Sequence, residues 1–184
     1  MLGTAVVVVV LAAAGCGGGG GGEAASPPTS VGPSPTSEPT SPSTAPTEEA
    51  AVLAAYQGYW DTWLAANDPP NPDHPDLERY ATGAALAKVK ESIADHRSVG
   101  QVLRLPERSI SEHRSRVERL AGATAVVVDC SIDDGLVVAY GSDMVLDDSV
   151  VTWDYEVVMV DQGGWRVGEL RVRDRSDGVV ACAA

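Results

Sequence analysis

Phenylalanine is absent from this sequence of 184 residues, and aromatic residues make up only 5% of it. Five tyrosines and four tryptophans must therefore supply the large aromatic side chains of any core. Tyr56, Tyr59, Trp60 and Trp63 form a stripe at helical spacing. We interpret this stripe mainly as core, with one or two edges left open to a cavity. Tyr56, Trp60, Trp63 and Tyr155 are accordingly the candidate pocket-lining residues.

Basic residues are also scarce. Two lysines and eleven arginines face 26 acidic residues, and the formal net charge is −13. All 13 basic residues follow residue 50, together with 22 of the acidic ones, so that part of the chain carries a net charge of −9. A domain this acidic binds nucleic acid poorly and is repelled by anionic lipid. We therefore expect no nucleic-acid partner, and membrane affinity must come from an anchor.

No apolar run reaches the roughly 20 residues that a membrane-spanning helix needs. The run from Val6 to Ala14 has instead the length of a signal-peptide core, and with Gly15 and Cys16 it resembles the lipobox of bacterial lipoproteins. The resemblance implies that a signal peptide, residues 1–15, is removed and that Cys16 then carries lipids on its sulfur and its new amino group. A plain secretory peptide with an incidental cysteine is the alternative, because no basic residue precedes the apolar run.

Residues 16–46 contain few apolar side chains. They begin with six glycines after Cys16 and continue mostly as Pro, Ser and Thr. Such a segment cannot bury enough apolar surface to fold. We expect a disordered tether that spans on the order of 30 Å as a flexible coil. It would hold the remaining domain, residues 47–184, at the outer face of the cell membrane and let it extend into the cell-wall layer.

Cysteine is rare as well, with three residues in the chain. Lipidation of Cys16 would leave Cys130 and Cys182, an even number in the oxidising compartment outside the cell. We therefore predict a disulfide between Cys130 and Cys182. Two buried free thiols are the alternative.

Helical signals come first in the region 47–184, and strand signals follow. Thr47 and the acids after it predict the start of a helix that runs to about Asn67. Further helical pieces are expected at 76–80 and 84–99, and strands at 109–120, 123–132, 136–140, 149–161 and 165–173. Asp133–Gly135 is interpreted as a hairpin-type turn. Helices followed by an antiparallel sheet predict an α+β fold in two layers.

Four short motifs carry a family resemblance. They are Tyr-Ala-Thr-Gly-Ala-Ala-Leu at 80–86, Val-Asp-Cys at 128–130, Gly-Trp-Arg-Val at 164–167 and the terminal Cys182. With them the chain resembles a group of actinobacterial lipoproteins whose domain is similar to nuclear transport factor 2 and the ketosteroid-isomerase-like proteins. The resemblance implies N-terminal helices packed in one curved antiparallel sheet, a cystatin-like cone.

The resemblance leaves three functions open, because the wider superfamily contains enzymes, pocket binders and modules without known activity. We favour a non-catalytic binding or accessory module that recruits a small ligand or an envelope protein. The alternatives are a pocket enzyme of isomerase or dehydratase type and a structural protein-interaction domain. A cavity lined by the aromatic residues and holding a buried, unpaired carboxylate would favour the enzyme.

The usual signatures of catalysis and metal binding are missing. His74, His96 and His113 lack the closely spaced partner of a zinc site. There is no Gly-rich phosphate loop, no nucleophile elbow and no Ser–His–Asp spacing. We therefore predict no catalytic residue, metal or cofactor, and interpret His74 and His113 as surface residues.

The remaining candidates for acid–base chemistry are three carboxylates in the predicted strands, Asp129, Asp154 and Glu156. If Gly163 and Gly164 form a two-residue hairpin loop, three acids each pair with an arginine: Asp161 with Arg166, Glu156 with Arg171 and Asp154 with Arg173. The same register pairs Val157 with Leu170 and Tyr155 with Val172 on the opposite, apolar face. Asp154 and Glu156 then lie on the outer face beside an arginine, which keeps a carboxylate ionised and unsuited to act as a base. Asp129, between Val128 and Cys130, is predicted to face solvent.

Overall fold

The structure is a computed structural model and describes residues 47–182. The predicted signal peptide at 1–15, the lipidated Cys16 and the tether at 16–46 lie outside the described residues. No helix within 47–182 is long and apolar enough to cross a membrane.

Three helices open the described part of the chain. They are α1 at Glu48–Ala65, α2 at Leu77–Tyr80 and α3 at Gly83–Ser98. Thr47 caps α1 as predicted, since its Oγ1 accepts a hydrogen bond from the Ala50 N–H at 3.2 Å. The chain leaves α3 through Gly100, whose φ of 67° lies in the left-handed region that favours glycine.

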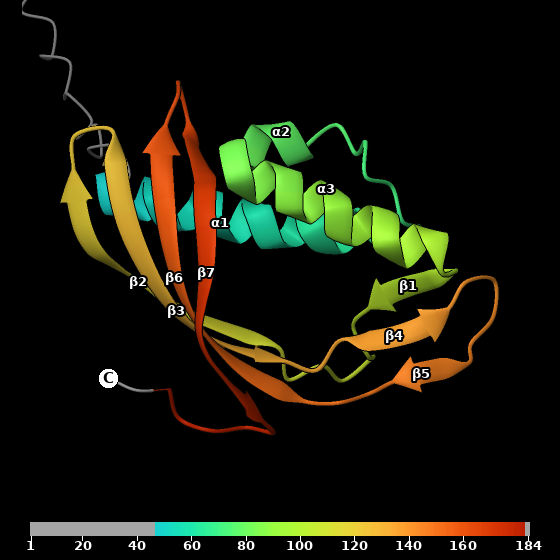
Figure 1. Ribbon diagram of the computed structural model, residues 1–184. Helices are drawn as coiled ribbons and strands as arrows, with labels where there is room; N and C mark the ends of the chain where they lie inside the picture. Colours follow the sequence, from blue (N-terminus) through green and yellow to red (C-terminus); the bar gives the residue numbers. More distant parts are fainter. Residues whose placement is uncertain (1–46, 183–184) are drawn as a thin grey trace, which may run out of the picture. The chain divides into compact units, whose positions relative to one another are not determined.

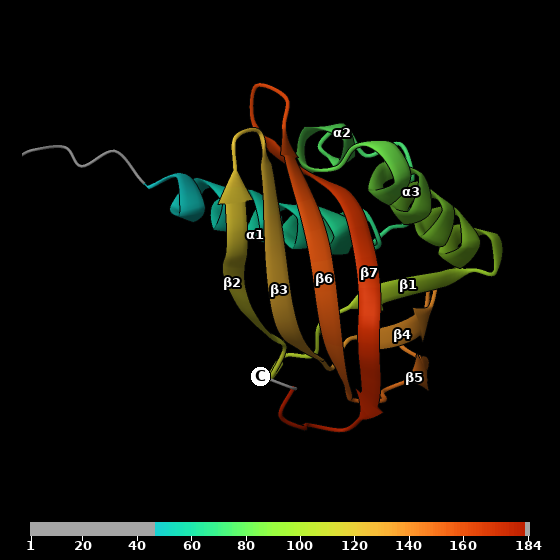
Figure 2. The same ribbon diagram turned by 60° about the vertical axis from the view of Figure 1, so that its left-hand side comes forward.

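Seven strands follow and form two antiparallel sheets. They are β1 at Gln101–Arg104, β2 at Glu112–Ala121, β3 at Thr124–Asp133, β4 at Leu136–Ala139, β5 at Val145–Asp147, β6 at Val151–Asp161 and β7 at Trp165–Asp177. One sheet has the order β2-β3-β6-β7 and the other β1-β4-β5. In Figures 1 and 2 the helices cover one face of the four-stranded sheet, and the smaller sheet lies beyond one end of it.

The predicted fold class, an α+β cone with the helices inside one curved sheet, is wrong. The strands belong to two separate sheets, and Asp133–Gly135 is not a hairpin turn but the passage from one sheet to the other. The buried Asp134 explains the passage, because its carboxylate accepts hydrogen bonds from Ser109 Oγ and Ile110 N, both at 2.6 Å. These bonds tie the chain to the segment before β2 instead of letting it fold back along β3.

The helix-facing side of the four-stranded sheet changes from apolar to polar along the strands. Near the β2–β3 turn, two rows of paired residues are entirely apolar: Leu120, Ala125, Met159 and Val167, then Val117, Val127, Val157 and Leu170. The next two rows are Ser115, Asp129, Tyr155 and Val172, then His113, Ser131, Trp153 and Arg175. Because alternate strand residues share a face, all four rows point to the same side. We call the first two rows, with Val52 of α1, the apolar half, and the last two, with Tyr56 and Trp60 of α1, the polar half.

The β6–β7 hairpin keeps only the middle of its predicted register. Glu156 pairs with Arg171, Val157 with Leu170 and Tyr155 with Val172, which confirms those three pairs. The loop has three residues, however, so Asp161 pairs with Trp165, and the unpaired Gly168 then restores the register as a bulge. A second irregularity places Asp154 opposite Asp174 instead of Arg173.

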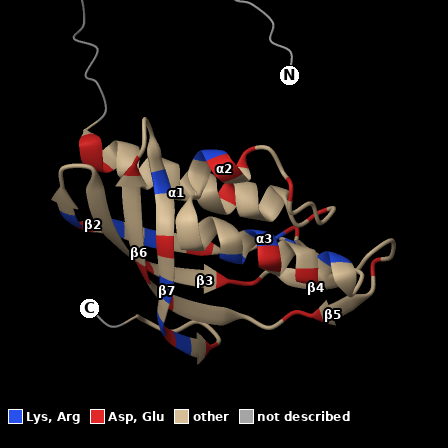
Figure 3. Ribbon diagram, turned by 45° about the horizontal axis from the view of Figure 1, so that its top comes forward, with Lys and Arg blue, Asp and Glu red and all other residues tan. Residues whose placement is uncertain are grey.

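The outer face of this hairpin nevertheless has the predicted electrostatics. Glu156 Oε1 lies 3.3 Å from Arg171 Nη1, and Asp154 Oδ2 lies 3.9 Å from Arg173 Nε. Figure 3 shows acidic and basic segments following one another along β7. Both carboxylates therefore lie beside an arginine, as predicted.

Cys130 and Cys182 are joined by a disulfide, with a Cα–Cα distance of 5.7 Å across a sequence separation of 52. The bond fastens the end of the chain to the central strand β3. In the chain-entropy model a loop of this length stabilises a fold by roughly 4 kcal/mol.

Candidate functional site

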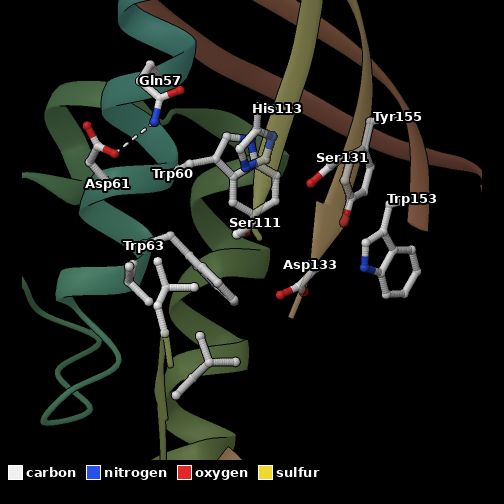
Figure 4. Close-up of a pocket in the computed structure, with 13 residues that line it drawn as sticks. Gln57, Trp60, Asp61, Trp63, Ser111, His113, Ser131, Asp133, Trp153 and Tyr155 are labelled. Atoms are coloured by element: carbon white, nitrogen blue, oxygen red, sulfur yellow. Dashed lines mark hydrogen bonds between the residues drawn. The ribbon is translucent and has the colours of Figure 1, made fainter. Parts of the chain in front are cut away.

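A cleft of about 150 Å³ lies between α1 and the polar half of the sheet. Its aromatic walls are Trp60, Trp63, Trp153 and Tyr155, and three leucines complete the apolar surface. Its polar lining is Gln57, Asp61, Ser111, His113, Ser131 and Asp133. Figure 4 shows these side chains converging from α1, β2, β3 and β6.

The sequence creates this cleft by placing small side chains where the sheet approaches α1. His113, Ser131 and Trp153 are paired residues of one row, and the small Ser131 separates the two large rings. On α1, Trp60 and Trp63 are three residues apart and so share one helix face. Large rings on the walls and a serine on the floor leave space that an apolar row would fill.

Trp60 is the centre of the aromatic wall. It stacks on His113 with ring centroids 4.9 Å apart and 26° between the planes. Trp63 meets it edge-on at 5.5 Å and 85°, and Tyr155 lies 5.7 Å away at 41°. Three of the four predicted lining residues, Trp60, Trp63 and Tyr155, thus lie at the cleft. The fourth, Tyr56, is only 1% exposed and lies behind it.

Asp129 is the buried centre of the polar half. Only 1% of it is exposed, and its carboxylate accepts hydrogen bonds from the Tyr56 hydroxyl at 2.8 Å and the Ser115 hydroxyl at 3.0 Å. His113 Nδ1 completes the set at 2.6 Å. Three donors satisfy a carboxylate that water cannot reach.

The prediction that Asp129 faces solvent is therefore wrong. β3 is a central strand and is buried on both faces, since Val126 and Val128 are buried as well as Ala125 and Val127. An apolar residue on each side of Asp129 could not identify the helix-facing side. The signal that would have found Asp129 is the set of polar residues around it, Ser115 in its own row and His113 and Ser131 in the next row, but this signal requires the register of β2 against β3.

His113 is not the surface residue predicted. Its side chain is 17% exposed, and Nδ1 is the atom that contacts Asp129. The opposite ring nitrogen, Nε2, is left for the cleft, which His113 lines. His74 and His96 lie elsewhere: His74 Nδ1 accepts the Asp76 N–H at 3.4 Å, and His96 Nδ1 is 2.7 Å from Asn67 Oδ1.

No group of three or more His, Cys, Asp or Glu side chains within 47–182 is placed to hold a metal ion. The described part of the chain therefore offers no candidate metal centre, and its candidate site is the cleft.

Burial makes the tyrosines of this region harder to ionise. It raises the pKa of Tyr56 and of Tyr155 far above the ordinary value for tyrosine, and the charges of Asp129 and Asp133 respectively raise them further. Burial alone raises the pKa of Tyr59 to about 12. At neutral pH Tyr155 therefore presents a hydroxyl, not a phenolate, beside the cleft.

Two indole N–H groups of the cleft wall, those of Trp60 and Trp153, have no hydrogen-bond partner among the described residues. Both nitrogens are buried. Figure 4 shows the nitrogen of Trp153 turned toward Asp133 and Tyr155. An unsatisfied buried donor costs about 1 to 3 kcal/mol, so an acceptor placed next to it would be favoured.

No protein-family model matches this chain, and no curated protein matches it. Among solved structures, the fold is similar to the intermembrane space region of the chloroplast protein ARC6, with a TM-score of 0.54 and 14% sequence identity. The match covers 70% of this chain and 98% of that one. At this identity the similarity concerns the fold alone, and it supports the correction of the predicted cone.

Proposed function

We propose that this protein is a ligand-binding module held at the outer face of the cell membrane by a lipidated Cys16, with the cleft between α1 and the sheet as its binding site. The observation that carries the proposal is the aromatic cleft, whose wall includes the unpartnered Trp153 N–H. Ligand sites are typically concave, mostly apolar and provided with a few fixed polar groups. Helices and strands position every aromatic residue here, which favours a preformed site.

The cleft is too small for a drug-sized molecule, which needs at least about 300 Å³. A volume of about 150 Å³ accommodates a benzene-sized group. The ligand is accordingly a small molecule, or the head group of a larger one whose remainder stays in solvent.

The binding proposal can be tested with a library of small fragments and ligand-observed NMR on the full chain. Ser131→Phe fills the floor of the cleft, so fragments that bind the wild-type protein should lose binding. Trp165→Phe is the control, because Trp165 is a buried tryptophan outside the cleft. Circular dichroism shows that each variant is folded. The proposal fails if no fragment binds the wild-type protein, or if the hits bind Ser131→Phe equally well.

The anchoring part of the proposal rests on the sequence from Val6 to Cys16. Replacing Cys16 with Ala should move the protein from the membrane fraction to the medium, or leave an uncleaved precursor. A Cys16→Ala protein that is still processed and membrane-bound would contradict the lipid anchor.

A second candidate function is favoured by the contact between His113 and Asp129. With Nδ1 directed at a buried carboxylate, Nε2 can take up or release a proton at the cleft. This arrangement suits an isomerase or dehydratase, although Asp129 itself already serves three donors. Incubating cleft-binding fragments in D₂O tests it: an enzyme should exchange a carbon-bound proton of such a ligand, and His113→Asn should abolish the exchange.

A further inference from the structure

We propose that the cleft binds a small methylated ammonium compound of the choline type. This inference rests on the proposed binding function and identifies the chemical class of the ligand.

The charge of the lining is the first argument. Asp61 and Asp133 contribute two carboxylates, and no lysine or arginine lines the cleft in the described part of the chain. Each carboxylate has one oxygen in a hydrogen bond at 2.9 Å, Asp61 with Gln57 Nε2 and Asp133 with the Gly135 N–H. The other oxygen of each remains available to a cation. The net charge of −9 after residue 50 also draws cations toward the domain.

Among the described residues that line the cleft, His113 is the one whose side chain can carry a positive charge. Asp129 lies 2.6 Å from its Nδ1, so a carboxylate directly compensates a charge on this ring. The cleft therefore stays negative whether or not His113 is protonated.

The aromatic wall is the second argument. The electron-rich faces of tryptophan and tyrosine attract cations, and several rings at different angles surround a methylated ammonium group. Trp63 is at 85° and Tyr155 at 41° to Trp60, so the rings do not all face one direction. Trp153 already has a cation at its ring: Arg175, ion-paired with Asp177, places its guanidinium carbon 5.4 Å from the centroid.

The size of the cleft and its hydrogen-bonding groups narrow the chemical class of the ligand. A trimethylammonium group is close in size to the benzene-sized space, and its methyl groups can contact Leu64 and Leu103 in the wall. A compact, strongly hydrated lysine ammonium would leave these apolar contacts unused. The unpartnered Trp153 N–H calls for an acceptor near the charge, which the hydroxyl of choline supplies and tetramethylammonium lacks.

The test compares four probes by calorimetry on the full chain. They are choline, tetramethylammonium, lysine amide, and the neutral carbon isostere of choline with a tert-butyl group in place of trimethylammonium. We expect choline to bind at least about tenfold more tightly than the isostere and a few-fold more tightly than tetramethylammonium. Asp133→Asn should weaken choline binding roughly five- to tenfold and leave the isostere unchanged. The control Asp143→Asn removes an equal charge from a fully exposed side chain outside the cleft and should change affinity less than about twofold.

Each contrary result identifies what has failed. If choline and its isostere bind equally well, the cleft does not select for a positive charge and this inference fails, although the cleft remains a binding site. If lysine amide binds more tightly than choline, the ligand is not a methylated ammonium compound and this inference fails. If the fragment hits of the preceding section bind while no ammonium compound does, this inference fails and the proposed function stands. If neither fragments nor ammonium compounds bind, both fail.

Discussion

The two halves of the helix–sheet interface are built from the same strands and the same helix, yet one is filled with apolar side chains and the other with polar ones. In the apolar half, Val52, Val127 and Val157 are completely buried against one another and their neighbours. In the polar half, the equivalent positions two residues further along β2 and β3 are Ser115 and Asp129, and a cleft follows. A close-packed core needs only apolar side chains of suitable volume. The polar half instead needs three specific donors for one carboxylate, and this costly arrangement is where we place function.

Removing the buried carboxylate gives the largest expected effect. Asp129→Ala leaves the Tyr56, Ser115 and His113 donors without their acceptor, and should lower the free energy of unfolding by about 4 kcal/mol. Urea denaturation measures it. Glu156→Ala, on the outer face beside Arg171, is the control and should cost less than about 1 kcal/mol. Similar losses in the two variants would mean that the polar half contributes no more to stability than a surface ion pair.

Alkaline pH tests the same half without mutation. The pKa values of Tyr56, Tyr59 and Tyr155 are raised in the folded protein, so they favour the folded state below the ordinary tyrosine pKa of about 10, and their contribution is lost as pH rises above it. Above that pH, each buried tyrosine should lower the free energy of unfolding by about 1.4 kcal/mol per pH unit. Tyrosinate absorbance followed against pH should show these residues ionising only with unfolding, and Tyr56→Phe should flatten the loss of stability. Normal ionisation of all five tyrosines in the folded protein would contradict the burial of this cluster.

The sequence predicted the features that depend on neighbours in the chain, and missed those that depend on pairing. Thr47 and Gly100 mark helix ends by their local chemistry. The centre of the β6–β7 register was predicted from a two-residue loop at Gly163 and Gly164, and it holds although the loop has three residues. The bulge at Gly168 was not predictable from charge pairs. β1 and β5, which have four and three residues and pair only with β4 in the smaller sheet, were not predicted.

The candidate site was predicted in part for the same reason. Trp60 and Trp63 were found because helical spacing places them on one face. Asp129 and His113 were not, because their contact depends on Ser115 pairing with Asp129 and His113 with Ser131 across two strands. Alternation gives a residue's face only when one face of the strand is exposed, and β3 is buried on both.

Enlarging a buried side chain should destabilise the apolar half more than the polar half, with a smaller effect on the free energy of unfolding than the changes above. Ala125 is 1% exposed in the apolar half, where Ala125→Leu should cost about 1 to 3 kcal/mol because close-packed neighbours must move. Ser131 lies at the floor of the cleft, where Ser131→Val should change stability by less than about 1 kcal/mol. Thermal denaturation of both variants makes the comparison. A larger loss at Ser131 than at Ala125 would show that the cleft is as tightly packed as the core.

The smallest expected effect is a loss of stability at acid pH through His96, which lies outside both halves. Desolvation lowers the pKa of His96, partly offset by the charge of Asp95, while its Nδ1 meets Asn67 Oδ1 at 2.7 Å. The neutral ring is therefore favoured in the folded state. The unfolded chain binds the proton more readily, so stability falls as pH drops below about 6.5. Because His96 is half-buried, we expect the loss to stay below about 1 kcal/mol. Urea midpoints measured at successive pH values should show a smaller acid decline for His96→Gln than for the wild-type protein, with His74→Gln as the matched control. A decline of equal size in His96→Gln would assign the acid response to other groups, and the polar half would then be the first place to look.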